Sequence, residues 1–394
     1  MRILSIHNVY QIRGGEEESR DSEERLLREN GHIVDSYEET NHDIEQYSSL
    51  QVALKSIWSQ KSYRIVKEKL KRNTYDVVHV QNFFPLISPS VYYAAQSMGV
   101  PVVQTLRNYR LICPNSLFFR DGQVCEDCLG KPIPYPGVVH GCYRTSRAVT
   151  GVTAAMLTSH RLARTWQKQV DVFIALTDFA KQKMIEGGLP AQKIIVKPNF
   201  VNPDPGPGSG AGKFALYVGR LSVEKGLDTL IEAWRQLEQP MPLKIIGDGP
   251  LAPVVEQAAQ ELVGVEWLGK KPIAEVHRLM GDASFLIFPS KWYETFGRVA
   301  VEAFAKGTPV IAANIGAIAE LVENGVTGLH FEPGNAHSLA QSVQWMLAHP
   351  EHQAKMRHQA RKIYLERYTS RQNYDQIMAI YRQAQLNANV KLSA

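Results

Sequence analysis

Four charged residues in the second half of the chain have the types and spacing to bind a phosphorylated ligand. Arg220 and Lys225 follow an apolar run, and Glu294 and Glu302 stand eight positions apart around a Thr-Phe-Gly turn. Arginine clamps phosphate oxygens in a bidentate fork, and lysine acts as a point charge. Two such cations at one strand end would neutralise a diphosphate without a metal ion. The alternative is that both are solvated surface charges.

The turn between the two glutamates predicts a helix start that binds an anion. Thr295 is the expected N-cap, because a hydroxyl that follows a strand and precedes a helix accepts first-turn hydrogen bonds. The helix dipole favours negative charge at the same place. The amide donors expected there belong to Phe296, Gly297 and Arg298.

The spacing of the two glutamates fits the length of a nucleotide sugar. Glu302 follows these first-turn amides by about five residues, or roughly 7 to 9 Å along the helix axis at about 1.5 Å per residue. This is about the distance from a diphosphate to the ribose of the same nucleotide. A carboxylate accepts hydrogen bonds from both ribose hydroxyls. Glu294 would face the sugar at the other end of the diphosphate. The alternative for Glu302 is a solvated helix acid, although its neighbours Val301, Ala303 and Phe304 are apolar.

Glycine-rich turns after other expected strands add weaker signals. Gly247 and Gly249 in "IIGDGP" would let backbone approach a ligand, although strand-to-helix turns often need glycine anyway. Gly15 and the acidic residues after it open a helix behind the first strand, where phosphate can approach. The chain has neither a GxGxxG fingerprint nor a GxxxxGK[ST] loop, which disfavours ATPases, GTPases and simple dehydrogenases.

Short apolar runs alternate with helical patterns in both halves of the chain, which predicts two α/β domains with parallel sheets. We expect two Rossmann-like, doubly wound domains that face a cleft, with ligands outside the carboxyl ends of the strands. Segment 199–213 is rich in Pro, Gly and Ser and is the expected linker. The predicted boundaries are residues 1–198 and 214–365 for the two domains and 366–394 for a final helix.

The composition favours a soluble protein with an anionic small ligand. Charged residues make up 21% of the chain and the net charge is +5, too weak an excess to indicate nucleic acid. The N-terminus lacks the pattern of a signal peptide and no run is long enough to span a bilayer. We therefore expect a cytoplasmic protein.

Four cysteines cluster in one Pro-rich stretch with the spacing C-x11-C-x2-C-x13-C: Cys113, Cys125, Cys128 and Cys142. A structural zinc site with four thiolate ligands would hold such a stretch together. The alternatives are free thiols, which are usual in the cytosol, or disulfides.

Basic helical segments in the first half allow two interpretations. Arg144, Arg147, Arg161, Arg164 and Lys168 lie among apolar residues. A solvated helix face is one explanation. The other is peripheral docking on an anionic membrane surface, on the inner face of the cell membrane, where a lipid-linked acceptor would lie.

Together these motifs resemble retaining glycosyltransferases of family 4, which have the GT-B fold and include enzymes of bacterial exopolysaccharide biosynthesis. The resemblance covers about residues 2–348 in order. It rests on "GGEE", "VVHVQNFFPLISPSV", "TLRNYRLICPN", "VGRLSVEKG", "GDGP", "ETFGRVAVE" and "GTPVIAANIGAIAELVENGVTG". The resemblance implies a nucleotide-sugar donor in the second domain, an acceptor on the first, and a final helix that crosses back to the first domain.

By this resemblance, Arg220 and Lys225 hold the diphosphate and are the residues most important for rate, Glu302 holds the ribose, and Glu294 contacts the donor sugar. The amides after Thr295 and Gly15 help to bind phosphate and sugar. No catalytic metal is expected.

Two positions depart from the family pattern. Arg107 stands where relatives often have a histidine that contacts the donor sugar, and Gln81 replaces another histidine. Arginine stays protonated and cannot act as a base. Arg107 would instead bind an acidic sugar, an acceptor or phosphate. His7 and His79 remain at strand ends, where a lone histidine is more often structural.

The sequence therefore predicts a metal-independent retaining glycosyltransferase that moves a hexose from a nucleotide sugar to a glycan or lipid-linked acceptor in polysaccharide biosynthesis. UDP-glucose or a related UDP-hexose is the favoured donor, since the family uses UDP-sugars most often. One alternative is a hydrolase or epimerase of nucleotide sugars on the same fold. The other is a non-catalytic sugar-binding scaffold, which the changes at Arg107 and Gln81 would favour.

Overall fold

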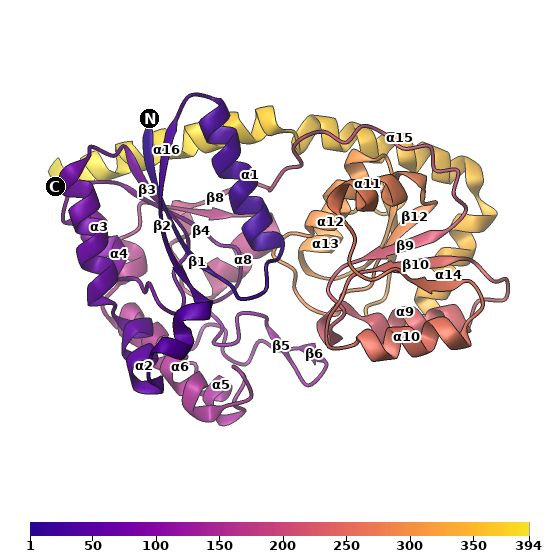
Figure 1. The fold of residues 1–394 in the computed structure, drawn as a ribbon, viewed down its shortest axis with the longest axis horizontal. Coiled ribbons are helices and arrows are strands. Elements are labelled where there is room, and N and C mark those ends of the chain that lie inside the picture. Colours follow the sequence, from indigo (N-terminus) through magenta and orange to yellow (C-terminus); the bar gives the residue numbers. More distant parts are fainter. Residues whose placement is uncertain (394) are drawn as a thin grey trace. The chain divides into compact units, whose positions relative to one another are not determined.

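The computed structural model describes residues 1–393, and the chain divides into two compact units (Figure 1). Unit 1 comprises Met1–Phe118, Glu126–Pro198 and the residues from Asn373 onward. Unit 2 comprises Phe119–Cys125 and Asn199–Gln372. Each unit contains one six-stranded sheet, and helices cover its faces.

All neighbouring strands of the unit 1 sheet are parallel, in the order β2-β1-β3-β4-β7-β8. The first strand lies inside the sheet, and its residues 3–8 are buried, the polar Ser5, His7 and Asn8 among them. The strands are β1 (Arg2–Val9), β2 (Ile33–Thr40), β3 (Val77–Asn82), β4 (Val102–Thr105), β7 (Val172–Ala175) and β8 (Ile194–Val196).

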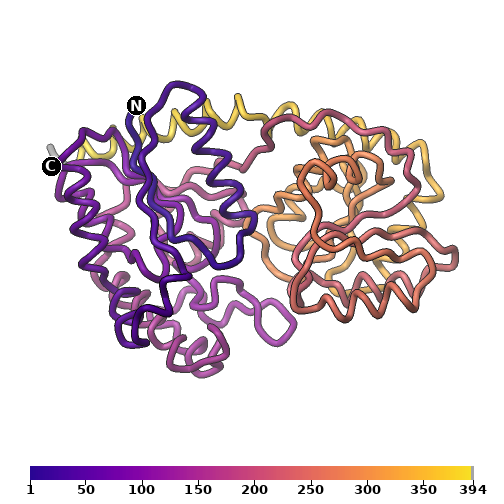
Figure 2. Tube along the Cα trace, in the orientation of Figure 1, coloured from indigo at the N-terminus to yellow at the C-terminus, as the bar shows by residue number. Residues whose placement is uncertain are grey.

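The helices of unit 1 connect these strands and include the end of the chain. They are α1 (Gly15–Glu29), α2 (Ser49–Ile57), α3 (Gln60–Arg72), α4 (Ser90–Gln96), α5 (Tyr135–Val139), α6 (Arg147–Leu162), α7 (Thr165–Lys168), α8 (Asp178–Glu186) and most of α16 (Ser370–Ser393). Ile377, Ile380 and Tyr381 of α16 pack into the core with Ile3 and Val77. The trace of the final helix thus rejoins the unit that contains the N-terminus (Figure 2).

Unit 2 repeats the parallel arrangement in the order β11-β10-β9-β12-β13-β14. A separate two-stranded antiparallel sheet pairs β5 (Phe119–Arg120) with β6 (Gln123–Val124). The strands of the main sheet are β9 (Ala215–Val218), β10 (Leu243–Ile246), β11 (Val265–Trp267), β12 (Phe285–Phe288), β13 (Val310–Ala313) and β14 (Gly328–Phe331). The two doubly wound sheets confirm the predicted α/β fold class.

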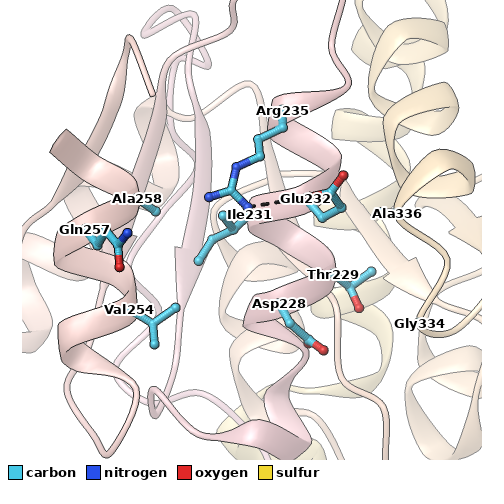
Figure 3. A pocket seen from close by; sticks show the side chains of 10 residues that line it. All are labelled: Asp228, Thr229, Ile231, Glu232, Arg235, Val254, Gln257, Ala258, Gly334 and Ala336. Atoms are coloured by element: carbon cyan, nitrogen blue, oxygen red, sulfur yellow. Dashed lines mark hydrogen bonds and ion pairs between the residues drawn. The ribbon is translucent and has the colours of Figure 1, made fainter. Parts of the chain in front are cut away.

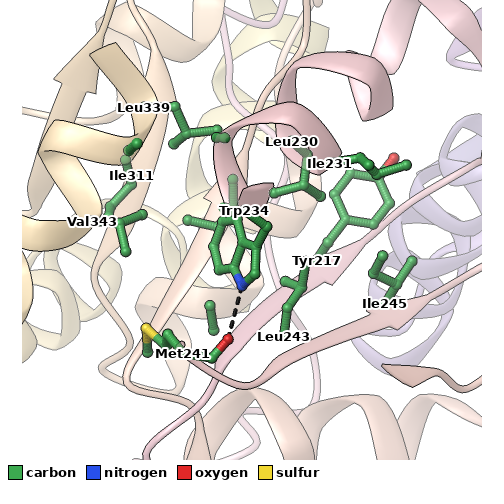
Figure 4. Packing of buried hydrophobic residues seen from close by; sticks show 14 of the residues in the cluster. Tyr217, Leu230, Ile231, Trp234, Met241, Leu243, Ile245, Ile311, Leu339 and Val343 are labelled. Atoms are coloured by element: carbon green, nitrogen blue, oxygen red, sulfur yellow. Dashed lines mark hydrogen bonds between the residues drawn. The ribbon is translucent and has the colours of Figure 1, made fainter. Parts of the chain in front are cut away.

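Helices α9, α10 and α14 lie on one face of this sheet, and α11 and α12 lie on the other (Figure 1). Buried residues of the sheet, α9 and α14 form one core around Trp234, whose Nε1 donates to the carbonyl oxygen of Met241 at 2.8 Å (Figure 4). The helices are α9 (Leu227–Arg235), α10 (Ala252–Glu261), α11 (Ile273–Asp282), α12 (Arg298–Ala305), α13 (Gly316–Leu321), α14 (Ala336–Ala348) and α15 (Pro350–Arg367).

The Pro- and Gly-rich segment 199–213 packs on unit 2. Backbone amides of Gly208, Gly210 and Gly212 donate to the carbonyl oxygens of Lys306, Gly281 and Asp282 at 2.8 to 2.9 Å. A Cβ at Gly208 would lie 2.2 Å from the backbone of Gly281, so this approach requires glycine. Within residues 1–393, no helix is both long and apolar enough to cross a bilayer.

Candidate functional site

The carboxyl ends of β9 and β12 form the point where the unit 2 sheet changes direction. The chain continues from β9 toward β10 and β11 on one side, and from β12 toward β13 and β14 on the other. In open α/β sheets, ligands bind outside the carboxyl ends of the strands at such a point. The structure brings Arg220 and Lys225, on the β9 loop, to the same edge as Glu294 on the β12 loop.

A glycine holds these two loops together. Gly226 has φ +71°, and a Cβ there would lie 1.9 Å from the carbonyl oxygen of Pro289. The amide of Lys291 also donates to the carbonyl oxygen of Glu224 at 2.9 Å. The β9 and β12 loops therefore touch through their backbones, and any side chain at position 226 would separate them.

Lys225 and Glu294 form an ion pair across the two loops. Nζ of Lys225 donates to Oε1 of Glu294. The same oxygen accepts from Oγ of Ser290 and Nε1 of Trp292, each at 3.0 Å. Nζ also lies 5.2 Å from the Trp292 ring centroid, within range of a cation–π interaction. The loop thus fixes both side chains, and Glu294 is only 8% exposed.

Arg220 is exposed, and its guanidinium makes no hydrogen bond or ion pair with the rest of residues 1–393. Its backbone is held, because the hydroxyl of Tyr217 donates to the carbonyl oxygen of Arg220 at 2.9 Å. Burial, together with the nearby charges of Glu294 and Glu224, raises the pKa of Tyr217, so this donor stays protonated. The result is an uncommitted cation on an ordered loop.

The predicted N-cap at Thr295 is wrong. Helix α12 begins at Arg298, and its N-cap is Gly297, which has φ +112°. Residues 290–296 instead form an irregular loop, in which the Glu294 carboxylate bonds to Ser290 and Trp292. The first-turn amides therefore start at Arg298, and those of Phe296 and Gly297 precede the helix.

Glu302 is buried on α12, which excludes a solvated helix acid. It is 5% exposed, and Oε1 accepts from Nε of Arg298 at 2.8 Å. His277 of α11 is also nearby: burial lowers its pKa, while the charge of Glu302 raises it. Nε2 of His277 is buried and has no hydrogen-bond partner within residues 1–393. Contact with a ribose stays a prediction for Glu302.

Close backbone packing explains why positions 247 and 249 are glycines. Their φ angles are +143° and +157°, and a Cβ at either would lie 1.8 to 2.5 Å from backbone oxygens of the β9 loop. The amides of Gly219 and Leu221 donate to the carbonyl oxygens of Ile246 and Asp248, each at 3.0 Å. These glycines therefore let the β10 turn pack against the loop that carries Arg220, and a contact with ligand stays a prediction.

Gly15 belongs to unit 1, where it is the first residue of α1. A Cβ there would meet nothing within 4 Å, so the fold itself does not require glycine. The neighbouring Glu17 caps the helix: its Oε2 accepts from the amide of Gly14 at 2.9 Å and its Oε1 from the amide of Tyr10 at 3.2 Å. Close approach of a ligand at Gly15 stays a prediction.

The two departures from the family pattern bond to each other inside unit 1. Nε and Nη2 of Arg107 donate to Oε1 of Gln81 at 2.9 and 2.7 Å. Nε2 of Gln81 donates to Oε1 of Glu23 at 2.9 Å, and Nζ of Lys197 donates to Oε2 of Glu23 at 2.7 Å. Arg107 is thus a buried member of a polar network, and a contact with donor stays a prediction.

The sequence does not single out Glu23 and Lys197, although both are almost fully buried. Burial opposes ionisation of Glu23, but the charges of Lys197 and Arg107 hold its pKa below the ordinary value. Burial lowers the pKa of His79 to about 4, so this imidazole is neutral at pH 7. Its Nδ1 pairs with the hydroxyl of Tyr381 at 2.8 Å, which supports a structural role.

One signal for Lys197 is present in the sequence. It follows the apolar run Ile194–Val196 directly and precedes a proline, at the end of an expected strand. Glu23 carries no such signal, because it stands among six other acids of α1.

The pocket in unit 2 lies apart from the predicted site residues. A pocket of about 450 Å³ lies between α9, α10 and the start of α14, and it contains none of the predicted site residues (Figure 3).

The predicted zinc site finds no support. Within residues 1–393, no group of three or more His, Cys, Asp or Glu side chains is placed to hold a metal ion. The carbonyl of Pro134 and the amide of Gly137 instead surround the Cys128 thiol.

Two family models match the chain. The model of the glycosyl transferase 4-like domain matches residues 52–199, and that of glycosyl transferases group 1 matches residues 207–363. An uncharacterized glycosyltransferase of Methanocaldococcus jannaschii is 34% identical over 183 residues, which cover 46% of this chain and 51% of that protein. Glycogen synthase of Mycobacterium tuberculosis is 38% identical over 141 residues, which cover 34% of each. The chain thus spans about half or less of these curated relatives.

Solved structures share the fold over nearly the whole chain. HepE of Anabaena in complex with UDP has a TM-score of 0.68 at 20% identity and covers 96% of this chain and 99% of its own. Sucrose-phosphate synthase of Thermosynechococcus elongatus has a TM-score of 0.72 at 19% identity, with 97% and 98% covered. At these identities the likeness establishes the fold.

Proposed function

The chain carries a glycosyl transferase 4-like domain followed by a glycosyl transferases group 1 domain, and from this premise we propose that it is a glycosyltransferase. It moves a hexose from a UDP-sugar, with UDP-glucose as the first candidate, to a glycan or lipid-linked acceptor. The proposed setting is polysaccharide biosynthesis. HepE, which shares the fold, was solved with UDP and with UDP-glucose, which supports this choice of donor.

The observation that carries the proposal is the set of charges at the carboxyl ends of β9 and β12. Arg220 has an uncommitted guanidinium there, and Lys225 uses one of its three N–H donors on Glu294. In the proposed reaction both cations stabilise the negative charge that develops on the leaving diphosphate. We propose that Arg220 and Lys225 provide this stabilisation without a metal ion.

The remaining residues of unit 2 position the donor in this proposal. Glu302 accepts hydrogen bonds from the ribose hydroxyls, and Arg298 holds its carboxylate in place. Glu294 contacts the donor sugar, on a carboxylate that Ser290 and Trp292 orient. From the resemblance to retaining enzymes of family 4, we propose transfer with retention, in which the leaving phosphate takes the proton of the acceptor on the same face.

Product analysis tests the activity. Purified protein is incubated with UDP-glucose and a panel of glycan acceptors, and the products are followed by proton NMR. The proposal predicts UDP and a new α-glucoside, since the donor is itself an α-anomer. UDP and free glucose with every acceptor would indicate a hydrolase, a changed sugar on UDP would indicate an epimerase, and donor binding without turnover would indicate a scaffold.

A membrane-bound acceptor has separate support from unit 1. Residues 129–170 contain six Lys or Arg and no Asp or Glu. The same stretch exposes Ile133, Tyr135, Val139 and Leu162, of which Leu162 is 80% exposed. We propose that this surface docks on anionic lipid, where basic and apolar side chains act together. Flotation with phosphatidylglycerol vesicles but not with phosphatidylcholine vesicles is the expected result, and equal behaviour with both would contradict it.

A further inference from the structure

Two adjacent glutamates at the start of α1 have different surroundings. Both carboxylate oxygens of Glu17 accept hydrogen bonds from backbone amides, so its capping role accounts for it. Glu16 has no such explanation. Its Oε1 is buried and has no hydrogen-bond partner among residues 1–393. Buried polar atoms without partners are uncommon and call for a physical reason.

The second oxygen of Glu16 is only weakly engaged. Nδ2 of Asn108 lies 3.4 Å from Oε2 of Glu16 and 3.3 Å from the hydroxyl of Tyr10. The amide of Arg110 donates to Oδ1 of Asn108 at 3.0 Å, which fixes the side-chain amide in this orientation. Asn108 therefore holds the carboxyl in place with one long contact and leaves Oε1 unused.

The cation beside this cluster is already committed. The Arg110 guanidinium donates to the carbonyl oxygen of Pro114 and to Oγ of Ser116. It also lies between two rings, 4.5 Å from the centroid of Phe84 and 4.4 Å from that of Tyr143. Arg110 is thus fixed by other partners, and the fold does not use it to neutralise Glu16 directly.

The electrostatic surroundings keep Glu16 close to a balance between its two protonation states. Burial raises the pKa of Glu16 to about 7; the charge of Arg107 opposes this, the charge of Glu17 adds to it, and Asn108 and Arg110 lower it. The groups that face Glu16 are these two arginines from the segment after β4, Glu17 from α1 and Tyr10 from the loop after β1. Tyr10 stays protonated, because burial raises its pKa well above the usual value.

A hydroxyl group is the ligand chemistry that fits these surroundings. A phosphate or carboxylate would lie against Glu16 and Glu17 and be repelled when both are ionised. A hydroxyl is neutral, and it can donate to a carboxylate or accept from a carboxylic acid. Asn108, which holds the carboxyl, and Arg110 also line a small pocket in unit 1 with Gln81 and Thr105.

We propose that Glu16 binds the sugar acceptor, one of whose hydroxyls donates a hydrogen bond to Oε1. This inference rests on the proposed glycosyltransferase function and assigns a residue to its acceptor side. Ionised Glu16 is the stronger hydrogen-bond acceptor, since charge-assisted bonds are roughly twice as strong as neutral ones. Acceptor binding therefore improves as Glu16 loses its proton.

The test uses the full chain, UDP-glucose as donor and methyl α-glucoside and methyl α-galactoside as acceptor probes. For wild type, the KM for the glycoside falls about tenfold from pH 6 to pH 8, because a group with a pKa of about 7 is about a tenth ionised at pH 6 and about nine-tenths ionised at pH 8. Glu16→Gln keeps a carbonyl acceptor but cannot ionise, so its KM is expected to be independent of pH, with kcat unchanged.

Glu18→Gln is the matched control, because Glu18 is on the same helix but is half-exposed and pairs with Arg13. It is expected to keep the pH dependence of wild type. Binding of the glycosides, measured by saturation-transfer NMR, must also be lost in Glu16→Ala while the variant keeps the unfolding temperature of Glu18→Gln.

A wild-type protein that binds neither glycoside, equal binding by Glu16→Ala, or an unchanged pH profile in Glu16→Gln overturns the inference. Failure of the proposed function is distinguished by the donor. If wild type converts no UDP-glucose in any assay, the function itself is wrong. Transfer that proceeds normally in Glu16→Gln and keeps its pH dependence leaves the function intact and removes only the assignment of Glu16.

Discussion

Replacement of Lys225 should affect both the stability of the fold and the rate of the proposed reaction, by separate mechanisms. Replacing it with methionine keeps an unbranched chain of similar length but removes the charge. In the structure this charge pairs with Glu294, whose Oε1 also accepts from Ser290 and Trp292. The substitution therefore deprives a buried carboxylate of its cation but leaves it two neutral donors.

The structure gives separate magnitudes for stability and for rate. The side chains of Lys225 and Glu294 are 22% and 11% exposed, so the pair is neither a surface pair nor fully buried. We expect Lys225→Met to lower the free energy of unfolding by about 1 to 3 kcal/mol, between the values typical of exposed and buried pairs. Loss of charge stabilisation at the leaving diphosphate should reduce kcat about 100- to 1000-fold, or about 3 to 4 kcal/mol.

The assay is steady-state release of UDP at saturating UDP-glucose, at a temperature well below unfolding, with thermal unfolding measured in parallel. Lys225→Arg keeps the charge and should retain most of the rate. Arg235→Met is the matched control, since Arg235 forms ion pairs at the other end of α9. A kcat for Lys225→Met within about threefold of wild type, or a loss equal to that of Arg235→Met, would refute the role of Lys225.

Four further predictions follow from the packing and the charges. Lys197→Met leaves buried Glu23 without its cation and should cost about 3 to 5 kcal/mol in urea unfolding, which Glu23→Leu should largely restore in the double variant. The pKa of Glu16 is raised to about 7 by burial, so its protonated form favours the fold, and wild type should lose stability relative to Glu16→Gln as the pH rises from about 4.5 to 7. Gly226→Ala should destabilise unit 2 and impair UDP-glucose turnover, whereas Gly325→Ala, also at positive φ but in open space, should affect stability only mildly. EDTA should leave transfer from UDP-glucose unchanged.

Each of these four predictions would be contradicted by a specific result. A double variant of Lys197 and Glu23 no more stable than Lys197→Met would deny their coupling. A constant stability difference between wild type and Glu16→Gln across this pH range would deny the raised pKa. Equal effects of Gly226→Ala and Gly325→Ala would contradict the backbone contact with Pro289, and loss of transfer in EDTA would contradict metal independence.

Most of the fold is predictable because its signals are local. The alternation of short apolar runs with helical patterns predicts the α/β class, and elements such as helix α11 show the 3.6-residue apolar period on which this prediction depends. The start of α12 is not predictable in this way. Thr295 has the right residue type for an N-cap, but hydrogen bonds to the Glu294 carboxylate within the loop and the left-handed Gly297 place the helix start at Arg298.

The charged residues of the site also differ in how far the sequence predicts their positions. Arg220, Lys225 and Glu294 follow strands, and parallel strands bring their carboxyl ends to one edge, so their shared location follows from topology. The pairing of Arg107 with Gln81 depends on contacts between residues 26 positions apart, which no local pattern encodes. For the same reason Glu23 is indistinguishable in sequence from the exposed acids of α1.

A crystal structure of the protein with UDP-glucose tests the central claim most directly. The account predicts that Arg220 and Lys225 lie within hydrogen-bond distance of the diphosphate oxygens and that Glu302 accepts from the ribose hydroxyls. A complex in which the diphosphate contacts neither cation, or in which Glu302 lies away from the ribose, would contradict it.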